Sequence, residues 1–204
     1  MLTMHWRTLS TVAALAAGVT VFSMTTAPEP APVAALEEGT FSIDGTHSSV
    51  VFKIVHLGVS PFYGRFNTVS GEFELHEDMA ESSVRVEIDA ASVDSNNADR
   101  DKHIKSADFF NVEQFPAITF ESKKVESKAE DQYAVTGDLE FHGVKKEVKI
   151  DLRFVGSGER GRFGYRAGFE GRMVIKRSDF GVKTMLEGLS DEVEVLLGIE
   201  GARK

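Results

Sequence analysis

The chain of 204 residues is long enough for one domain with a sizeable hydrophobic core. Its formal charge of −9 at pH 7 repels phosphates, so the composition argues against nucleic acid as a partner. The sequence contains no cysteine, which excludes disulfides, thiol catalysis and thiolate metal sites.

The first 35 residues have the layout of a secretory signal peptide. Arg7 precedes an apolar run from Leu9 to Met24, and small residues and prolines follow it. Small residues at 33–35 suit cleavage, so we predict an exported mature chain that begins near Leu36. An uncleaved membrane anchor is the alternative, because the apolar run approaches the length of a spanning helix.

From Phe41 onward, apolar and polar residues alternate with a period of two, which is typical of strands with one wet face. Between Val69 and Leu75, for example, every second residue is apolar or glycine. Similar series occupy residues 84–90, 133–141, 148–154, 163–175 and 193–199, and apolar runs lie at 50–57 and 116–125. The series from 163 to 175 includes Phe163 among the residues expected to point inward.

These series predict an all-β domain over residues 36–204 with about eight long antiparallel strands and short glycine-rich connections. Strands with one apolar face must close on themselves or stack as two sheets, and their length favours an extended eight-stranded barrel. Such a barrel is filled by side chains or holds one small ligand. Small residues on the inward parity either leave cavity volume or permit sharp bends: Gly71, Ala90, Gly137, Ala167 and Gly171.

The charged stretch "NNADRDKHIKSADFF" interrupts this alternation. We predict one short helix at about residues 97–110 near the barrel mouth, capped by Asn96 or Asn97, with Asp101 and Lys105 as an ion pair. Arg100 and Asp101 are expected to tie the helix to a neighbouring loop, while His103 caps or packs.

The alternative for this stretch is a lipid-directed hydrolase with His103 as general base. A nucleophile in a recognisable setting is missing, because no Gly-x-Ser-x-Gly elbow or helical Ser-x-x-Lys motif occurs. We therefore predict no enzyme and no catalytic residues. The histidines of the mature part are scattered, so we expect neither a metal site nor a cofactor: His47, His56, His76, His103 and His142.

Four basic residues share the outward parity of one expected strand: Arg162, Arg166, Arg172 and Lys176. This stripe indicates either a solvated face balanced by acidic neighbours or a surface that docks on lipid head groups. We also expect Arg177 and Asp179 to lie at the barrel mouth and to join the helix through charge-assisted hydrogen bonds.

Five blocks, in order, resemble the YceI-like family: "FSIDGTHSSVVFKIVHLGVSPFYGRFNTVSGEFEL", "VDSNNADRDKHIKSADFFNVEQFPAITFES", "VTGDLEFHGVKKEVKI", "GRMVIKRSDFGV" and "LSDEVEVLLGIEGARK". The resemblance covers residues 40 to 203. It implies a lipocalin-like barrel of the bacterial periplasm that holds a polyisoprenoid, an isoprenoid quinone or a fatty-acyl amide or acid. An interaction protein with a filled barrel remains the other alternative.

From parity and resemblance together we predict which residues meet the lipid. The lining is expected to comprise Phe52, Ile54, Phe73, Leu75, Val86, Ile88, Phe120, Leu139, Phe141, Ile150, Leu152, Phe169 and Met173. The mouth or head-group residues are expected to be Arg100, Asp101, His103 and Arg177. Among partners, the sequence leaves open a transient membrane contact and a homodimer.

Overall fold

The computed structural model describes residues 36–204, and the predicted signal peptide lies outside the described residues. Within the described part no helix is long and apolar enough to cross a membrane. The strands are β1 (Gly39–Ile43), β2 (Ser49–His56), β3 (Ser60–Phe66), β4 (Val69–Leu75), β5 (Ser83–Asp89), β6 (Val93–Asp94), β7 (Ala117–Ala129), β8 (Gln132–Phe141), β9 (Val144–Glu159), β10 (Tyr165–Lys176) and β11 (Leu189–Arg203). The helices are α1 (Ala98–Lys105) and the 3-10 turns η1 (Met79–Glu81), η2 (Ala90–Ser92), η3 (Gly161–Phe163) and η4 (Arg177–Phe180).

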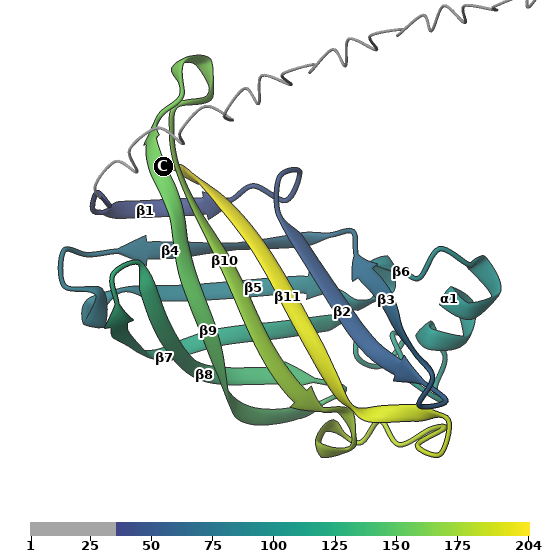
Figure 1. Cartoon of the computed structure of the whole chain (residues 1–204). Coiled ribbons are helices and arrows are strands. Elements are labelled where there is room, and N and C mark those ends of the chain that lie inside the picture. Colours follow the sequence, from purple (N-terminus) through teal and green to yellow (C-terminus); the bar gives the residue numbers. More distant parts are fainter. Residues whose placement is uncertain (1–35) are drawn as a thin grey trace, which may run out of the picture. The chain divides into compact units, whose positions relative to one another are not determined.

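Strand β11 closes the sheet into a barrel (Figure 1). Along one edge it pairs with β10, and along the other it pairs with β2 and then with β1. Val195 lies opposite Phe52 of β2, while Arg203 lies opposite Phe41 of β1. Closure by hydrogen bonds leaves no free edge along the strands that β11 joins.

The eleven strand segments occupy eight positions around the barrel. The segments β1 and β2 follow one another along the same edge of β11 and so share one position. In the same way β3 and β4 share a second position, and β5 and β6 share a third. Every pairing is antiparallel between neighbours. The predicted eight-stranded antiparallel barrel with one helix is therefore confirmed.

At two of the small inward residues, Gly71 and Gly137, neighbouring backbone approaches closely, so the cavity explanation is wrong for these two. A Cβ atom on Gly71 would lie 2.1 Å from the Arg85 carbonyl oxygen, and one on Gly137 would lie 2.3 Å from the Glu121 carbonyl oxygen. Gly137 also faces the bulge at which the β7–β8 register shifts. Backbone comes close at these points because glycine leaves room for it.

Aromatic side chains fill the end of the barrel around β1. Phe41 has no exposed surface and stacks on Phe73 with ring centroids 5.0 Å apart. Phe169 meets the Phe73 ring edge-on at 5.5 Å, and Tyr165 lies beside Phe41. This cluster, which we call the aromatic plug, closes that end. Phe163 does not point inward as predicted, because it lies in η3 and is 51% exposed.

The helix α1 is shorter than predicted. It begins after Asn97, whose side-chain oxygen accepts a hydrogen bond from the Arg100 amide at 2.9 Å. It ends at Lys105, because the hydroxyl of Ser106 turns back to the His103 carbonyl at 2.7 Å. The rest of the predicted helix forms turns that carry Phe109 and Phe110 toward the barrel interior.

Replacing Gly137 with alanine tests whether close strand approach is the reason for this glycine. We expect Gly137→Ala to lower the free energy of unfolding by about 1–3 kcal/mol, because backbone atoms have to move. Urea denaturation measures the loss. Gly168→Ala is the matched control, since a Cβ atom there meets nothing nearer than 3.7 Å. Equal stabilities of the two variants would contradict the explanation.

Candidate functional site

The barrel encloses a cavity of about 570 Å³ with a mostly apolar wall. All thirteen residues predicted to line it lie in this wall: Phe52, Ile54, Phe73, Leu75, Val86, Ile88, Phe120, Leu139, Phe141, Ile150, Leu152, Phe169 and Met173. They come from seven strands, which the closed sheet brings around one space. Their contact with a ligand stays a prediction.

Several wall residues were not predicted. Val193, Val195 and Leu197 of β11 line the cavity, and the alternation in that strand was sufficient to find them. Phe109 and Phe110 also line it, although they lie outside regular structure. The sequence gives no period in such turns, so their direction could not be predicted.

Polar side chains gather at the end of the cavity beside α1. His56, Asp99, Arg100 and His103 contribute to the wall there. The Arg100 guanidinium lies 4.3 Å from the centroid of the Phe62 ring, and its Nε donates to the Ser95 hydroxyl at 2.8 Å. The cation is therefore held in place by stacking and by hydrogen bonds at the edge of an apolar space.

Asp101 does not belong to the cavity wall, which corrects its assignment to the mouth. Its carboxylate accepts hydrogen bonds from the Ser95 amide at 2.8 Å and from the Ser95 hydroxyl. These bonds turn it toward the loop before α1 and away from Lys105, its predicted partner. The expectation that Arg100 and Asp101 tie the helix to a neighbouring loop is confirmed.

His103 packs as expected. The edge of the Phe109 ring approaches its imidazole with centroids 5.0 Å apart, and its Nε2 lies 3.3 Å from the Asp108 carboxylate. Both partners lie on the turn that follows α1. His103 therefore joins the helix to this turn at the rim of the cavity.

Arg177 lies in the cavity wall, but it does not join α1 as predicted. It is 4% exposed, and its guanidinium donates to the carbonyl oxygens of Thr184 at 2.7 Å, Ser190 at 2.9 Å, Leu189 and Val182. Burial lowers its pKa, and the four carbonyl groups accept from four of its five N–H donors. Its bonds fix the loop before β11.

The predicted partner of Arg177 also lies elsewhere. Asp179 forms an ion pair with Lys146 at 3.2 Å. The contact between the loop before β11 and the turn after α1 is made by the Thr184 hydroxyl, which donates to the Asp108 carbonyl oxygen. A neutral hydrogen bond thus takes the place of the expected charged one.

A YceI-like domain model matches residues 41–201, which is nearly the whole described barrel. The chain belongs to the YceI-like family. The UPF0312 protein of Azotobacter vinelandii is 47% identical over 162 residues, covering 79% of this chain and 84% of that protein.

Solved structures agree with this YceI-like assignment. The YCEI protein of Campylobacter jejuni superposes with a TM-score of 0.66 at 30% identity, covering 74% of this chain and 90% of that one. A polyisoprenoid binding domain from Saccharophagus degradans gives a TM-score of 0.61 at 17% identity, covering 80% of this chain and 98% of that one. The second likeness shows a shared fold.

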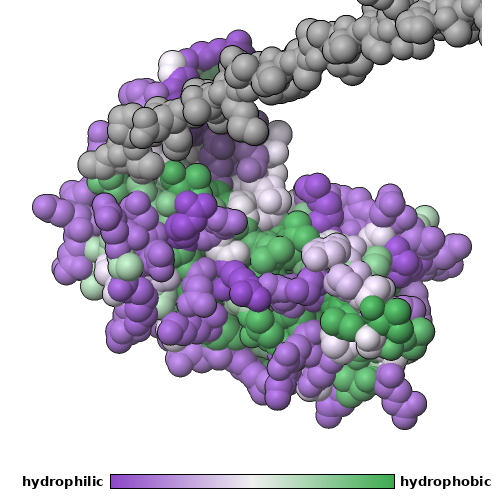
Figure 2. Space-filling model, viewed as in Figure 1, coloured by the Kyte–Doolittle hydropathy of each residue, from purple (hydrophilic) through white to green (hydrophobic). Residues whose placement is uncertain are grey.

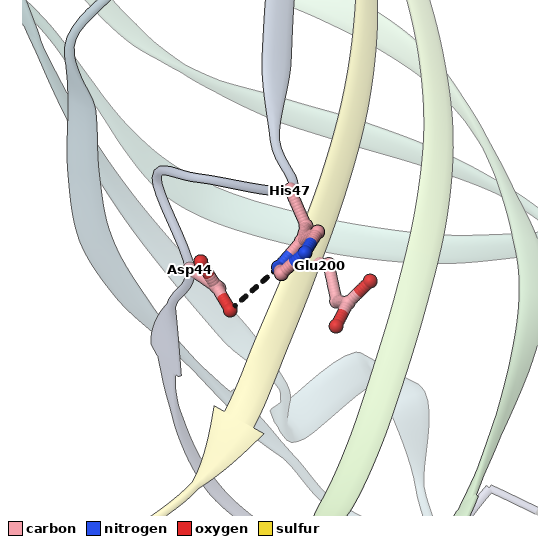
Figure 3. Close-up of side chains that lie close together, drawn as sticks. All are labelled: Asp44, His47 and Glu200. Atoms are coloured by element: carbon pink, nitrogen blue, oxygen red, sulfur yellow. Dashed lines mark hydrogen bonds and ion pairs between the residues drawn. The ribbon is translucent and has the colours of Figure 1, made fainter. Parts of the chain in front are cut away.

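This YceI-like barrel also brings together Asp44, His47 and Glu200, whose ligand atoms lie within 4.8 Å of one another (Figure 3). The sequence did not predict the group, because Glu200 reaches it only through strand pairing. The Asp44 carboxylate accepts from the Arg166 guanidinium at 2.7 Å, and Glu200 lies 3.4 Å from the same nitrogen. Because the Arg166 guanidinium already contacts both carboxylates, it competes with any cation for them.

Three of the four residues of the outward basic stripe have acidic neighbours, whereas Arg162 lies in η3 and not in the strand, with its guanidinium over the Phe163 ring. Arg166 contacts Asp44 and Glu200, and Arg172 forms an ion pair with Glu194. Across the β10–β11 pairing, Lys176 lies opposite Glu192. The first of the two readings of the stripe, a solvated face with paired charges, agrees with these contacts.

The pair of His47 and Asp44 predicts a pH dependence of stability. The hydrogen bond that His47 donates to the Asp44 carboxylate raises the pKa of His47, and the bonds that Asp44 accepts from His47 and Arg166 hold the pKa of Asp44 well below its usual range. A raised folded pKa means that the His47 contribution is complete below the unfolded value of 6.5 and is lost as pH rises through the folded value.

We therefore expect His47→Gln to lower the melting temperature more at about pH 5.5 than at about pH 8.5. Thermal unfolding across this range measures the difference. In an Asp44→Asn background the effect of the same histidine substitution should vary less with pH, because only the weaker attraction of Glu200 remains. An effect of His47→Gln that does not vary with pH would contradict the pairing.

Proposed function

We propose that this barrel binds and carries one long-chain amphiphile in its interior, of the polyisoprenoid, isoprenoid quinone or fatty-acyl amide or acid class. The observation that supports this is the apolar cavity of about 570 Å³ within a closed sheet. Its volume lies in the range of about 300–1,000 Å³ that small-molecule sites occupy.

Burial of an alkyl chain supplies enough free energy for such binding. At about 0.8 kcal/mol per methylene, a chain of roughly 15 carbons gains on the order of 12 kcal/mol before costs. Ordering the chain and immobilising the ligand cost several kcal/mol. A micromolar affinity, near −8 kcal/mol, is then reached without an ionic contact.

The distribution of polar groups supports one orientation of the ligand. His56, Asp99, Arg100 and His103 line the α1 end, whereas Phe73 and Phe169 of the aromatic plug line the opposite end. A polar head group therefore finds hydrogen-bonding partners beside α1. The tail extends toward the plug, where the wall is apolar apart from Ser82 and Ser83.

The fold shared with a polyisoprenoid binding domain supports the isoprenoid class. Branched isoprenoid units and straight acyl chains bury similar apolar surface per carbon, and hydrophobic walls discriminate between them by only about 1–3 kcal/mol per methylene. The proposal therefore names a class of ligand.

We also propose binding without catalysis. In the part of the chain that the structure describes, the only hydrogen-bonding partner of the His103 ring is the Asp108 carboxylate. The Ser106 hydroxyl donates to the His103 carbonyl oxygen and not to its ring. A general base needs a proton donor within hydrogen-bond reach, and this arrangement favours a structural role for His103.

The proposed place of action is the periplasm. The pattern of Arg7, the apolar run from Leu9 to Met24 and the small residues after it supports export. An amphiphile that crosses an aqueous compartment needs a cover for its apolar chain, and a closed barrel supplies one.

A substitution that fills the cavity tests the proposal. Val86 lies in the cavity wall, and we expect Val86→Trp to weaken binding of a fluorescent fatty acid by on the order of tenfold or more. The physical reason is that two or three methylenes lose their place, at about 0.8 kcal/mol each. Fluorescence titration measures the dissociation constant.

Val174→Trp is the matched control for that titration. Val174 is 53% exposed on the outer face of β10, so the same substitution adds bulk without entering the cavity. Its affinity should equal that of the unchanged protein. Equal affinities for Val86→Trp and Val174→Trp would place the ligand outside the barrel.

A further inference from the structure

Large apolar side chains are exposed at the loop tips beside the α1 end of the barrel. The tip patch consists of Leu57, Val59, Met185 and Leu186, with Val59 84% and Leu57 63% exposed. Figure 2 shows a hydrophobic surface at the lower right, the corner where Figure 1 draws the β2–β3 turn and the loop before β11. The patch therefore lies at one end of the barrel.

The two loops of the patch support one another. The Leu57 amide donates to the Gly188 carbonyl oxygen at 2.7 Å, and β2 pairs with β11 at the adjoining positions His56 and Leu189. Single exposed apolar residues are ordinary on protein surfaces, whereas a cluster of them marks an interaction site.

Two patch residues have a backbone conformation that is costly for their type. Leu57 has φ 52° and Met185 has φ 56°, both in the left-handed region that glycine and asparagine occupy more readily. Each stands at a turn and directs a large apolar side chain into solvent. Strained backbone of this kind that exposes apolar surface is a reason to look for a function at the patch.

The tip patch is continuous with the cavity. Met185 is 52% exposed and also lines the cavity, as do its neighbours Leu189 and His56. Apolar surface thus extends from the interior over the rim to the loop tips. A ligand that leaves along this surface keeps its alkyl chain in apolar contact.

We propose that the tip patch docks on the surface of a lipid bilayer and there exchanges ligand with it. This inference rests on the proposed function, because an amphiphile with a long alkyl chain resides in membranes and is scarce in water. Apolar side chains bind a bilayer by entering the boundary between head groups and acyl chains.

Charge at the tip agrees with a bilayer as partner. The chain carries −9 overall, but the β2–β3 turn at 57–59 is uncharged, and the loop at 182–188 has one lysine and one glutamate. A neutral tip approaches a bilayer without the repulsion that the rest of the acidic surface meets at anionic lipids. Docking therefore requires no anionic lipid and depends little on salt.

A single label at the tip tests docking on the full chain. The sequence has no cysteine, so Val59→Cys offers one thiol for an environment-sensitive nitrobenzoxadiazole dye. With phosphatidylcholine vesicles we expect a blue shift and a roughly twofold or greater rise in emission, because the dye leaves water for the bilayer boundary. Phe163→Cys, at the β9–β10 hairpin beyond the plug, is the control and should not respond.

Other outcomes overturn the proposal. If neither label responds, the tip does not enter the bilayer. If both respond equally, another part of the chain holds the protein at the vesicle without orienting the tip. If the Val59 label responds to protein concentration without vesicles, the patch is a contact between two copies of the chain.

The role in exchange is tested with Leu57→Asn and Leu186→Asn together, at two exposed patch residues that lie outside the cavity wall. Asparagine tolerates the left-handed backbone of Leu57, so these changes remove apolar surface without disturbing the turn. We expect transfer of a pyrene-labelled fatty acid from vesicles to slow by on the order of tenfold, with unchanged affinity for the same probe in solution. Val155→Ser, which changes an exposed residue on the outer face of β9, should leave the rate unchanged.

Failure of this inference and of the proposed function are distinguishable. Equal transfer rates for the double variant and the unchanged protein overturn tip docking while leaving cavity binding intact. Absence of probe uptake by every protein overturns cavity binding, and the response of the Val59 label then judges docking alone.

Discussion

The hydrogen bonding of β11 on both edges is the constraint on which the rest of the structure depends. One edge pairs with β10, while the other pairs with β2 near the α1 end and with β1 near the aromatic plug. This double pairing turns an open antiparallel sheet into a barrel and gives every strand an inside. It also brings Glu200 beside Asp44 and Arg166, so the charged cluster secures the point at which β1 gives way to β2.

Closure alone does not determine whether the inside is solid. Around β1, large rings such as Phe41, Phe73 and Phe169 fill the interior of the barrel. Toward α1 the inward residues include shorter aliphatic side chains such as Val86 and Val193, which leave the apolar space of about 570 Å³. The inward-facing residues of the same strands therefore form the aromatic plug at one end and the cavity wall toward the other. A guest chain in that space would gain the apolar contacts that the wall lacks.

Period-two alternation was sufficient to predict the barrel and the parity of its wall, because strand geometry is local and one face must be buried. The alternation could not predict contacts that depend on pairing between distant segments, such as the contact between Glu200 and Asp44. Arg177 was misjudged for a related reason: charge predicts a charged partner, whereas the fold supplies four backbone carbonyl groups. Gly137 was ambiguous, because glycine suits both an empty space and a close approach of strands.

The central claim is that a ligand with an apolar chain fills the interior of the barrel. The most direct test is to analyse what the native protein contains. Protein purified from its own cells without detergent is extracted with organic solvent, and the extract is quantified by mass spectrometry against the protein. The account predicts one amphiphile with a long alkyl or isoprenoid chain, near one per barrel in the best-loaded fraction and depleted by Val86→Trp. An extract without such a molecule, from protein that also takes up none when offered it, would contradict the account.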